Sequence, residues 1–209
     1  IEVLYLPHIS NFTDFDPLER EEDISLRYVK MGERLGEPDL LIIPGSKNTL
    51  DDLYYLKKLG YQEEISNRLK KGTVIVGICG GYQMLGRQLY DPEYTESSRE
   101  KIKGLGLING ATTLRPKKIT FQVRAHLLPN PFFDNQDELS GYEIHTGETV
   151  LLGDEKSLFK ISKRGFTQTD INDGVVSKEG MVWGTYIHGI FDNNNFRESF
   201  INFLRRKKE

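Results

Sequence analysis

A single cysteine stands at the end of an apolar run, and its surroundings suit it for nucleophilic chemistry. Residues 73–78 are rich in β-branched side chains and predict a buried strand. Cys79 follows, with Gly77 and Gly81 two residues away on either side. This is the spacing of a nucleophile elbow, in which a strand turns sharply into a helix and presents the central side chain.

The start of a helix favours the reactive form of a thiol. The positive end of the helix dipole stabilises the thiolate, and the N–H of Gly80 can help to hold an oxyanion. A lone cysteine is more commonly a small buried hydrophobic residue, and glycines alone can serve a tight turn. The buried strand and the flanking glycines together favour a nucleophile at Cys79.

A cysteine nucleophile needs a base, and a histidine at the end of a neighbouring strand is the usual one. Residues 181–187 predict a strand that leads directly to His188, between Gly184 and Gly189. His188 is therefore the best candidate for the base. The remaining histidines are His8, His126 and His145.

The group that orients the imidazole is not evident, because no acid follows His188 before Asp192. Glu143 or Glu148 could reach it from a neighbouring strand. A backbone carbonyl or a carboxylate from another domain could also do so. Without such a partner the imidazole would sample unproductive rotamers, so we expect the chain alone to be a poor catalyst.

Composition limits the classes of protein to consider. The 209 residues are 37% hydrophobic and 28% charged, as in one ordinary folded domain. The net charge of −3 does not indicate the basic surface that binds nucleic acid. We expect no membrane span, no signal peptide and a cytoplasmic location. One cysteine and scattered histidines predict no metal site.

The chain begins without methionine in a strand-like run, so we expect a fragment of a longer protein.

The order of patterns predicts a three-layer α/β fold with a mainly parallel sheet between helices. Helix starts are predicted at Asp16-Pro17 and at a capping box of Thr49 with Asp52. Residues 91–103 predict an exposed loop. Later strands with little helix between them predict an antiparallel section in the second half. Strand patterns cover 1–6, 24–29, 39–43, 73–78, 104–108, 119–128, 140–152, 157–163 and 181–187, and helix patterns cover 49–57, a segment through 65–69, and 195–205.

Ligands of such folds bind at the carboxyl ends of the parallel strands. Cys79 follows one predicted strand, Gly45 follows another and His188 follows a third. We therefore expect these three residues to meet at one edge of the sheet.

Several segments resemble class I glutamine amidotransferases. They are residues 79–86 (CGGYQMLG), 41–49 (LIIPGSKNT) and 184–189 (GTYIHG). Residues 9–18 and 141–145 resemble the cobyric acid synthase branch of these enzymes, and the resemblance covers nearly the whole chain. It implies a flavodoxin-like arrangement of the three layers.

The resemblance also implies a mechanism. The cysteine would attack the side-chain amide of L-glutamine, and the histidine would protonate the leaving ammonia and then activate water. By this resemblance Cys79 and His188 are catalytic, the N–H groups of Gly80 and of the Gly45-Ser46 turn form the oxyanion hole, and Gln83 holds the bound glutamine.

Members of this branch carry an N-terminal ATP-dependent synthetase domain with a phosphate-binding loop. No G-x-x-x-x-G-K-[ST] motif occurs here. Residues 1–209 are therefore expected to form a single glutaminase domain, with no cofactor of its own. ATP and Mg²⁺ would bind to the synthetase domain, which would amidate peripheral carboxylates of adenosylcobyrinic acid a,c-diamide to form cobyric acid in cobalamin biosynthesis.

Related activities are the alternatives. They are the glutaminase of cobyrinic acid a,c-diamide synthase, the glutaminase that serves amidation of a cell-wall lipid precursor, and a non-catalytic binding module on the same fold. Residues 11–18 favour the cobyric acid synthase branch.

Overall fold

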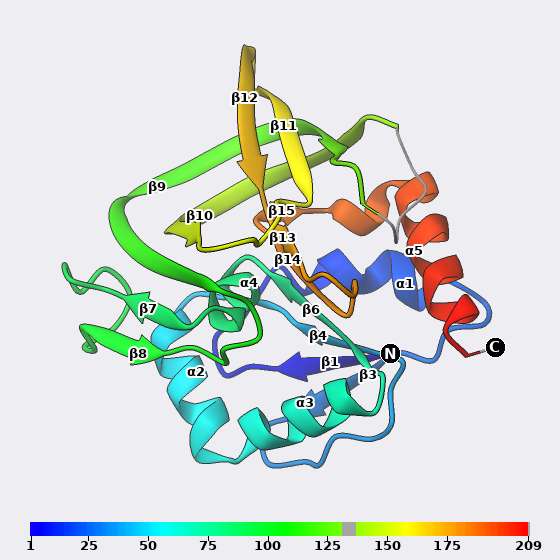
Figure 1. Ribbon diagram of the computed structural model, residues 1–209. Helices are drawn as coiled ribbons and strands as arrows, with labels where there is room; N and C mark the ends of the chain where they lie inside the picture. Colours follow the sequence, from blue (N-terminus) through cyan, green and yellow to red (C-terminus); the bar gives the residue numbers. More distant parts are fainter. Residues whose placement is uncertain (131–136, 209) are drawn as a thin grey trace.

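The computed structural model describes residues 1–130 and 137–208 and is built around a central parallel sheet (Figure 1). Neighbouring strands β14, β6, β4, β1 and β3 are parallel, and β13 is antiparallel to β14. The strand order is β13 (Val175–Val176), β14 (Val182–Thr185), β6 (Val74–Ile78), β4 (Leu40–Ile43), β1 (Glu2–Tyr5) and β3 (Arg27–Lys30).

Helices cover both faces of this sheet. Every residue of β4 and β6 is buried, as apolar parallel strands between two helical layers require. Figure 1 shows α2 (Thr49–Lys58) and α3 (Tyr61–Lys70) on one side, with α1 (Asp16–Glu19) and α5 (Asn194–Arg206) on the other. The predicted three-layer fold is confirmed. No helix in the described residues is long and apolar enough to cross a membrane.

A second sheet is mainly antiparallel and confirms the predicted antiparallel section. Because β15 follows β14 after a single residue, the chain passes from the central sheet into the second sheet next to His188. The strand order is β12 (Thr167–Asp173), β11 (Phe159–Arg164), β9 (Gly110–Leu127), β10 (Leu139–Leu151) and β15 (Ile187–His188), with β7 (Gln88–Tyr90) paired to β9 and to β8 (Lys101–Lys103).

The prediction of a strand at residues 104–108 is wrong. The N–H groups of Leu105 and Leu107 donate to the carbonyl groups of Met84 and Leu85 at 2.8 and 2.9 Å. These carbonyls belong to the last turn of α4 (Gly80–Leu85) and have no partner within that helix. The segment therefore closes a helix end and does not join a sheet.

The predicted loop at residues 91–103 is more ordered than expected. Its last three residues form β8, and Asp91 and Ser97 are buried. The Asp91 carboxylate accepts hydrogen bonds from the N–H groups of Thr95, Glu96 and Ser97 at 2.6 to 3.1 Å. One buried acid thus fixes the backbone of this loop.

The predicted helix starts are each displaced by one residue. Asn48 caps α2, and its side chain accepts the N–H of Asp51 at 3.3 Å. Asp52 is drawn away from the helix end, because its carboxylate accepts the hydroxyl of Ser46. At α1 the cap is Phe15, and Asp16 is already helical.

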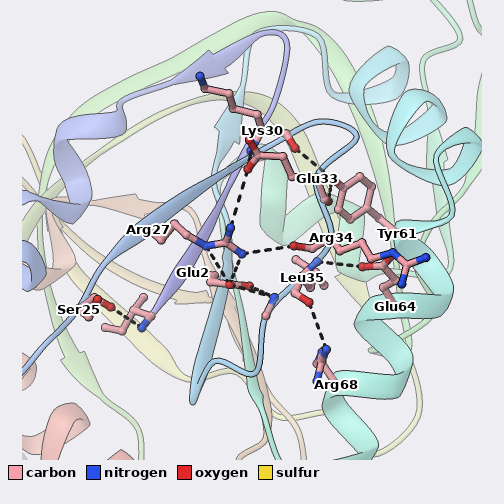
Figure 2. Close-up of polar contacts among 12 residues, drawn as sticks. Glu2, Ser25, Arg27, Lys30, Glu33, Arg34, Leu35, Tyr61, Glu64 and Arg68 are labelled. Atoms are coloured by element: carbon pink, nitrogen blue, oxygen red, sulfur yellow. Dashed lines mark hydrogen bonds and ion pairs between the residues drawn. The ribbon is translucent and has the colours of Figure 1, made fainter.

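A buried acid in β1 holds the segment that follows the edge strand β3 (Figure 2). Glu2 is only 6% exposed, and its carboxylate accepts hydrogen bonds from Arg27 at 2.5 Å and from the N–H of Gly36 at 3.0 Å. From α3, Arg68 donates to the carbonyl of Leu35 at 3.1 Å. These contacts fix the edge of the sheet opposite to β13.

Candidate active site

The predicted elbow forms at the junction of β6 and α4. Cys79 has φ of 52° and ψ of −110°, a conformation that is strained for a residue with a side chain. Both flanking glycines are needed for close approach. A Cβ at Gly81 would lie 1.9 Å from the carbonyl oxygen of Ile43, and one at Gly77 would lie 2.6 Å from that of Gly81.

Residues from neighbouring strand ends meet around this elbow. Gly45, Cys79 and His188 follow β4, β6 and β14, as the sequence predicted. A Cβ at Gly45 would lie 3.4 Å from Cε1 of His188. A fourth residue, Asp14, arrives from the segment after β1. The strands β14, β6, β4 and β1 are adjacent in the sheet, so their carboxyl ends bring these groups together.

His188 is fully buried and is held by Asp14. Its Nδ1 donates to Oδ2 of Asp14 at 2.6 Å, and the N–H of Gly189 donates to Oδ1 at 3.1 Å. The ring of Tyr142 stacks on the imidazole with centroids 5.1 Å apart, and the Tyr142 hydroxyl accepts from Asn11 at 2.8 Å. The imidazole is therefore fixed in position, and its Nδ1 carries a proton.

The charge of the imidazole is also set by these neighbours. Burial opposes a positive charge on His188, but interactions with Asp14 and Cys79 outweigh it and raise the pKa to about 10. The imidazole is therefore protonated at neutral pH. Within the described residues its Nε2 makes no hydrogen bond of ordinary geometry, as is common for catalytic contacts without substrate.

The expectation that Glu143 or Glu148 orients His188 is wrong. His188 pairs with Tyr142 across β10 and β15, so the next residue, Glu143, points to the other face of the sheet. There Glu143 accepts two hydrogen bonds from Arg164, at 2.6 and 2.7 Å. Burial opposes the charge of Glu143, but His145 and Arg164 lower its pKa. Glu148 is exposed.

The other histidines have different partners. Nδ1 of His145 is 2.7 Å from the carbonyl oxygen of Gly147, and its ring stacks on Tyr186 at 3.9 Å. His8 is bonded to Asp52 at 2.8 Å, and His126 is about half exposed. Of the four histidines, His188 is the one bonded to Asp14.

The turn predicted to bind an oxyanion is fixed beside the elbow. The short strand β5 (Gly45–Ser46) pairs with β2 (Ile9–Ser10). The hydroxyl of Ser46 donates to the buried carboxylate of Asp52 at 2.6 Å. A Cβ at Gly80 would lie 2.9 Å from the backbone nitrogen of Ser46. The backbones of Gly80 and Ser46 therefore lie in direct contact at the elbow.

A cavity of about 370 Å³ opens beside Cys79, within the range of small-molecule sites. Gln83 lines it, as does Ser46. The side-chain nitrogen of Gln83 donates to the hydroxyl of Tyr186 at 3.3 Å. Its buried Oε1 has no hydrogen-bond partner within the described residues. The geometry suits a nucleophilic displacement on a small polar substrate.

Sequence reasoning missed two acids at this site. Asp14 lies within residues 9–18, a segment singled out for its resemblance, which was a signal that could have identified it. Glu96 lies in the loop predicted to be exposed and lines the cavity with Cys79. No local pattern distinguishes Glu96 from the other acids of that loop.

Comparisons with known proteins find relatives over the whole length of this chain. The family model for the CobB/CobQ-like glutamine amidotransferase domain matches residues 1–196. Cobyric acid synthase of Caldanaerobacter subterraneus subsp. tengcongensis is 46% identical over 212 residues, which cover 100% of this chain and 42% of that protein. Cobyric acid synthase of Moorella thermoacetica is 48% identical over 211 residues, covering 100% of this chain and 41% of that protein. This chain thus spans about two fifths of the length of these relatives.

Solved structures share the fold. PurLQS from Thermotoga maritima superposes with a TM-score of 0.73 at 22% identity, over 97% of each chain. A glutamine amidotransferase superposes with a TM-score of 0.66 at 16% identity, over 98% of this chain and 99% of the other. At these identities the likeness establishes the fold alone.

Proposed function

Because the chain belongs to the CobB/CobQ-like glutamine amidotransferase domain family, we propose that it hydrolyses L-glutamine with Cys79 as nucleophile. His188 serves as acid and then as base. The observation that carries the proposal is the buried imidazole of His188. Its Nδ1 is hydrogen-bonded to Asp14, and its interaction with Cys79 raises its pKa. This is the arrangement of nucleophile, base and orienting acid that acyl transfer needs.

Acylation begins when the Cys79 sulfur attacks the side-chain amide carbon of glutamine. The carbonyl oxygen becomes an oxyanion, which the N–H groups of Gly80 and Ser46 stabilise; their direct contact supports this role. His188 gives its proton to the amide nitrogen. The C–N bond then breaks, ammonia leaves and a thioester remains.

Deacylation uses the same groups, but His188 now accepts a proton instead of donating one. The neutral His188 takes a proton from water, whose oxygen attacks the thioester carbon. A second oxyanion forms and collapses, the C–S bond breaks and glutamate leaves. The thiolate of Cys79 and the protonated His188 are thereby restored. Asp14 stabilises the imidazolium at both stages.

The ammonia is proposed to serve an ATP-dependent amide synthetase domain of the same polypeptide. Relatives named cobyric acid synthase are more than twice the length of this chain, which supports a further domain in the whole protein. ATP and Mg²⁺ would bind in that domain. The acceptors would be peripheral carboxylates of adenosylcobyrinic acid a,c-diamide, and the product would be cobyric acid.

Replacement of the nucleophile tests the proposal. Cys79→Ser should lower the rate of glutamate formation at least about 10³-fold, because a hydroxyl is a far weaker nucleophile than a thiolate. The melting temperature should change little. A diazoketone analogue of glutamine should label Cys79 in the wild-type chain, as read by peptide mass spectrometry.

Two histidine variants provide the matched comparison. His188→Ala should abolish glutamate formation, whereas His126→Ala should not, because the side chain of His126 is 45% exposed and lies next to Glu138. Labelling of another residue, together with activity retained in Cys79→Ser, would show that the assignment is wrong.

A further inference from the structure

Strand β10 contacts both proposed catalytic groups. The ring of Tyr142 stacks on the imidazole of His188, and Sγ of Cys79 lies 3.6 Å from the carbonyl oxygen of Ile144. Tyr142 also lies directly opposite His188 in the pairing of β10 with β15. The geometry of the thiol and the imidazole therefore depends on the position of this part of β10.

The backbone pairing of β10 is interrupted close to this contact. On the side of β9, the register passes from Ile119 opposite His145 to Leu114 opposite Gly147. Residues 115–118 of β9 thus stand opposite Thr146 alone. Because such a bulge disrupts the ladder locally, side-chain contacts must help to hold β10 at this point.

The other face of β10 carries a buried carboxylate. Side chains alternate between the two faces of a strand, so Glu143 and His145 point away from the face that carries Tyr142. Glu143 is 1% exposed, and Nε2 of His145 lies 3.5 Å from its Oε1. A buried carboxylate is costly unless it is paired. The partner of Glu143 therefore restricts where this carboxylate, and with it the backbone of β10, can lie.

Arg164 is that partner, and it reaches Glu143 across an intervening strand. Arg164 ends β11, which pairs with β9, and β9 pairs with β10. Its Nε and Nη2 donate to the two carboxylate oxygens of Glu143 at 2.6 and 2.7 Å. A guanidinium bound to both oxygens of a carboxylate fixes orientation as well as distance. The ion pair therefore holds β10 at a defined position relative to β11.

We propose that Arg164 is a positioning residue for glutamine hydrolysis. It acts through Glu143, which it holds on the face of β10 opposite to Tyr142. The strand is thereby kept where Tyr142 packs on His188 and where its backbone lies beside Cys79. This inference rests on the proposed glutaminase function and leaves the chemical steps to the groups already described.

The test separates the geometry of the ion pair from its contribution to stability. Arg164→Gln leaves the Glu143 carboxylate buried without its cation, so the melting temperature should fall. The kcat for glutamine hydrolysis should fall about 10- to 100-fold, because a displacement of about 1 Å near a reacting centre can cost about 10²-fold. The change in KM should be smaller.

Two further variants distinguish charge from geometry. In the double variant Glu143→Gln/Arg164→Gln no unpaired carboxylate is left, so the melting temperature should recover part of the loss. Its kcat should stay low, because the two-point contact between the side chains is still missing. Arg164→Lys keeps the charge but donates from a single nitrogen, so its kcat should lie between those of the wild type and Arg164→Gln.

Lys160→Gln is the matched control in the same hairpin. It removes the ion pair between Lys160 and Asp170 at 2.7 Å, whose side chains are 37% and 80% exposed. Because exposed pairs contribute little, kcat should stay within about twofold of the wild type. All rates are measured at a temperature at which circular dichroism shows the variants to be folded.

The outcomes separate this inference from the proposed function. A wild-type kcat in folded Arg164→Gln, or in the folded double variant, would overturn the inference alone, since the ion pair would then serve stability only. If Arg164→Gln does not fold, the double variant decides. A wild-type chain that does not hydrolyse glutamine would overturn the proposed function and the inference with it.

Discussion

Replacing Asp14 by Asn tests how much of the catalysis depends on the orientation of His188. Asp14 accepts two hydrogen bonds, from Nδ1 of His188 at 2.6 Å and from the N–H of Gly189 at 3.1 Å. An asparagine has one acceptor oxygen, so it can keep only one of them. If its amide NH₂ faces the imidazole, the proton moves to Nε2 and the base is in the wrong tautomer.

The size of the effect follows from these two possibilities. Loss of the charge-assisted bond alone corresponds to about 1.5–3 kcal/mol, or roughly 10- to 150-fold in rate. A wrong tautomer costs about 10⁴-fold when the orienting acid of a triad is replaced by its amide. We therefore expect kcat to fall by between about 10-fold and 10⁴-fold in Asp14→Asn, with a smaller change in KM.

The assay is the initial rate of glutamate formation at saturating glutamine. Asp16→Asn is the matched control, because it removes the same charge two residues away, at the start of α1. Circular dichroism establishes that both variants are folded. A kcat for Asp14→Asn within threefold of the wild type would refute the orienting role of Asp14.

Two further predictions concern stability. The pKa of His188 is raised from 6.5 to about 10, so its stabilising effect is complete below pH 6.5 and is lost as the pH rises through 10. The melting temperature should therefore fall more steeply between pH 7 and 10 in the wild type than in His188→Gln; parallel curves would contradict this. Gly81→Ala places a methyl group 1.9 Å from the carbonyl oxygen of Ile43 and should cost at least about 1–3 kcal/mol in urea unfolding. Gly106→Ala, which meets no atom within 4 Å but has φ of 72°, should cost only about 1 kcal/mol.

The central sheet and the elbow could be predicted because their signals are local. The strands β4 and β6 are continuous apolar runs, which few other structures require. The elbow needs small residues at Gly77 and Gly81, where backbone atoms approach within 3 Å of the place of a Cβ. The residue types within a few positions of Cys79 are therefore enough to predict the elbow.

The orienting acid could not be predicted, because 174 residues separate Asp14 from His188. Topology restricts the site to one edge of the sheet but does not select a residue. Glu143 and Glu148 were predicted because a neighbouring strand could bring them within reach of His188. Strand alternation decides against Glu143, and it depends on a register that sets Tyr142 opposite His188.

Glu96 was missed for a different reason. Its loop is polar and without periodicity, so composition alone predicts exposure. The buried Asp91 binds three N–H groups of that loop, and this local arrangement turns Glu96 toward the cavity. Side-chain to backbone bonds of this kind have no sequence period.

The position of Asp14 removes one reason to expect a poor glutaminase. That expectation rested partly on an imidazole without an orienting acid, and the chain itself supplies the acid. The segment after β1 makes further contacts at the site. Ile9 and Ser10 pair with the Gly45–Ser46 strand. Asn11 donates to the hydroxyl of Tyr142, whose ring stacks on His188. One short loop thus contacts both the proposed base and the proposed oxyanion turn. Any contact that displaces this loop must change proton transfer and oxyanion binding together.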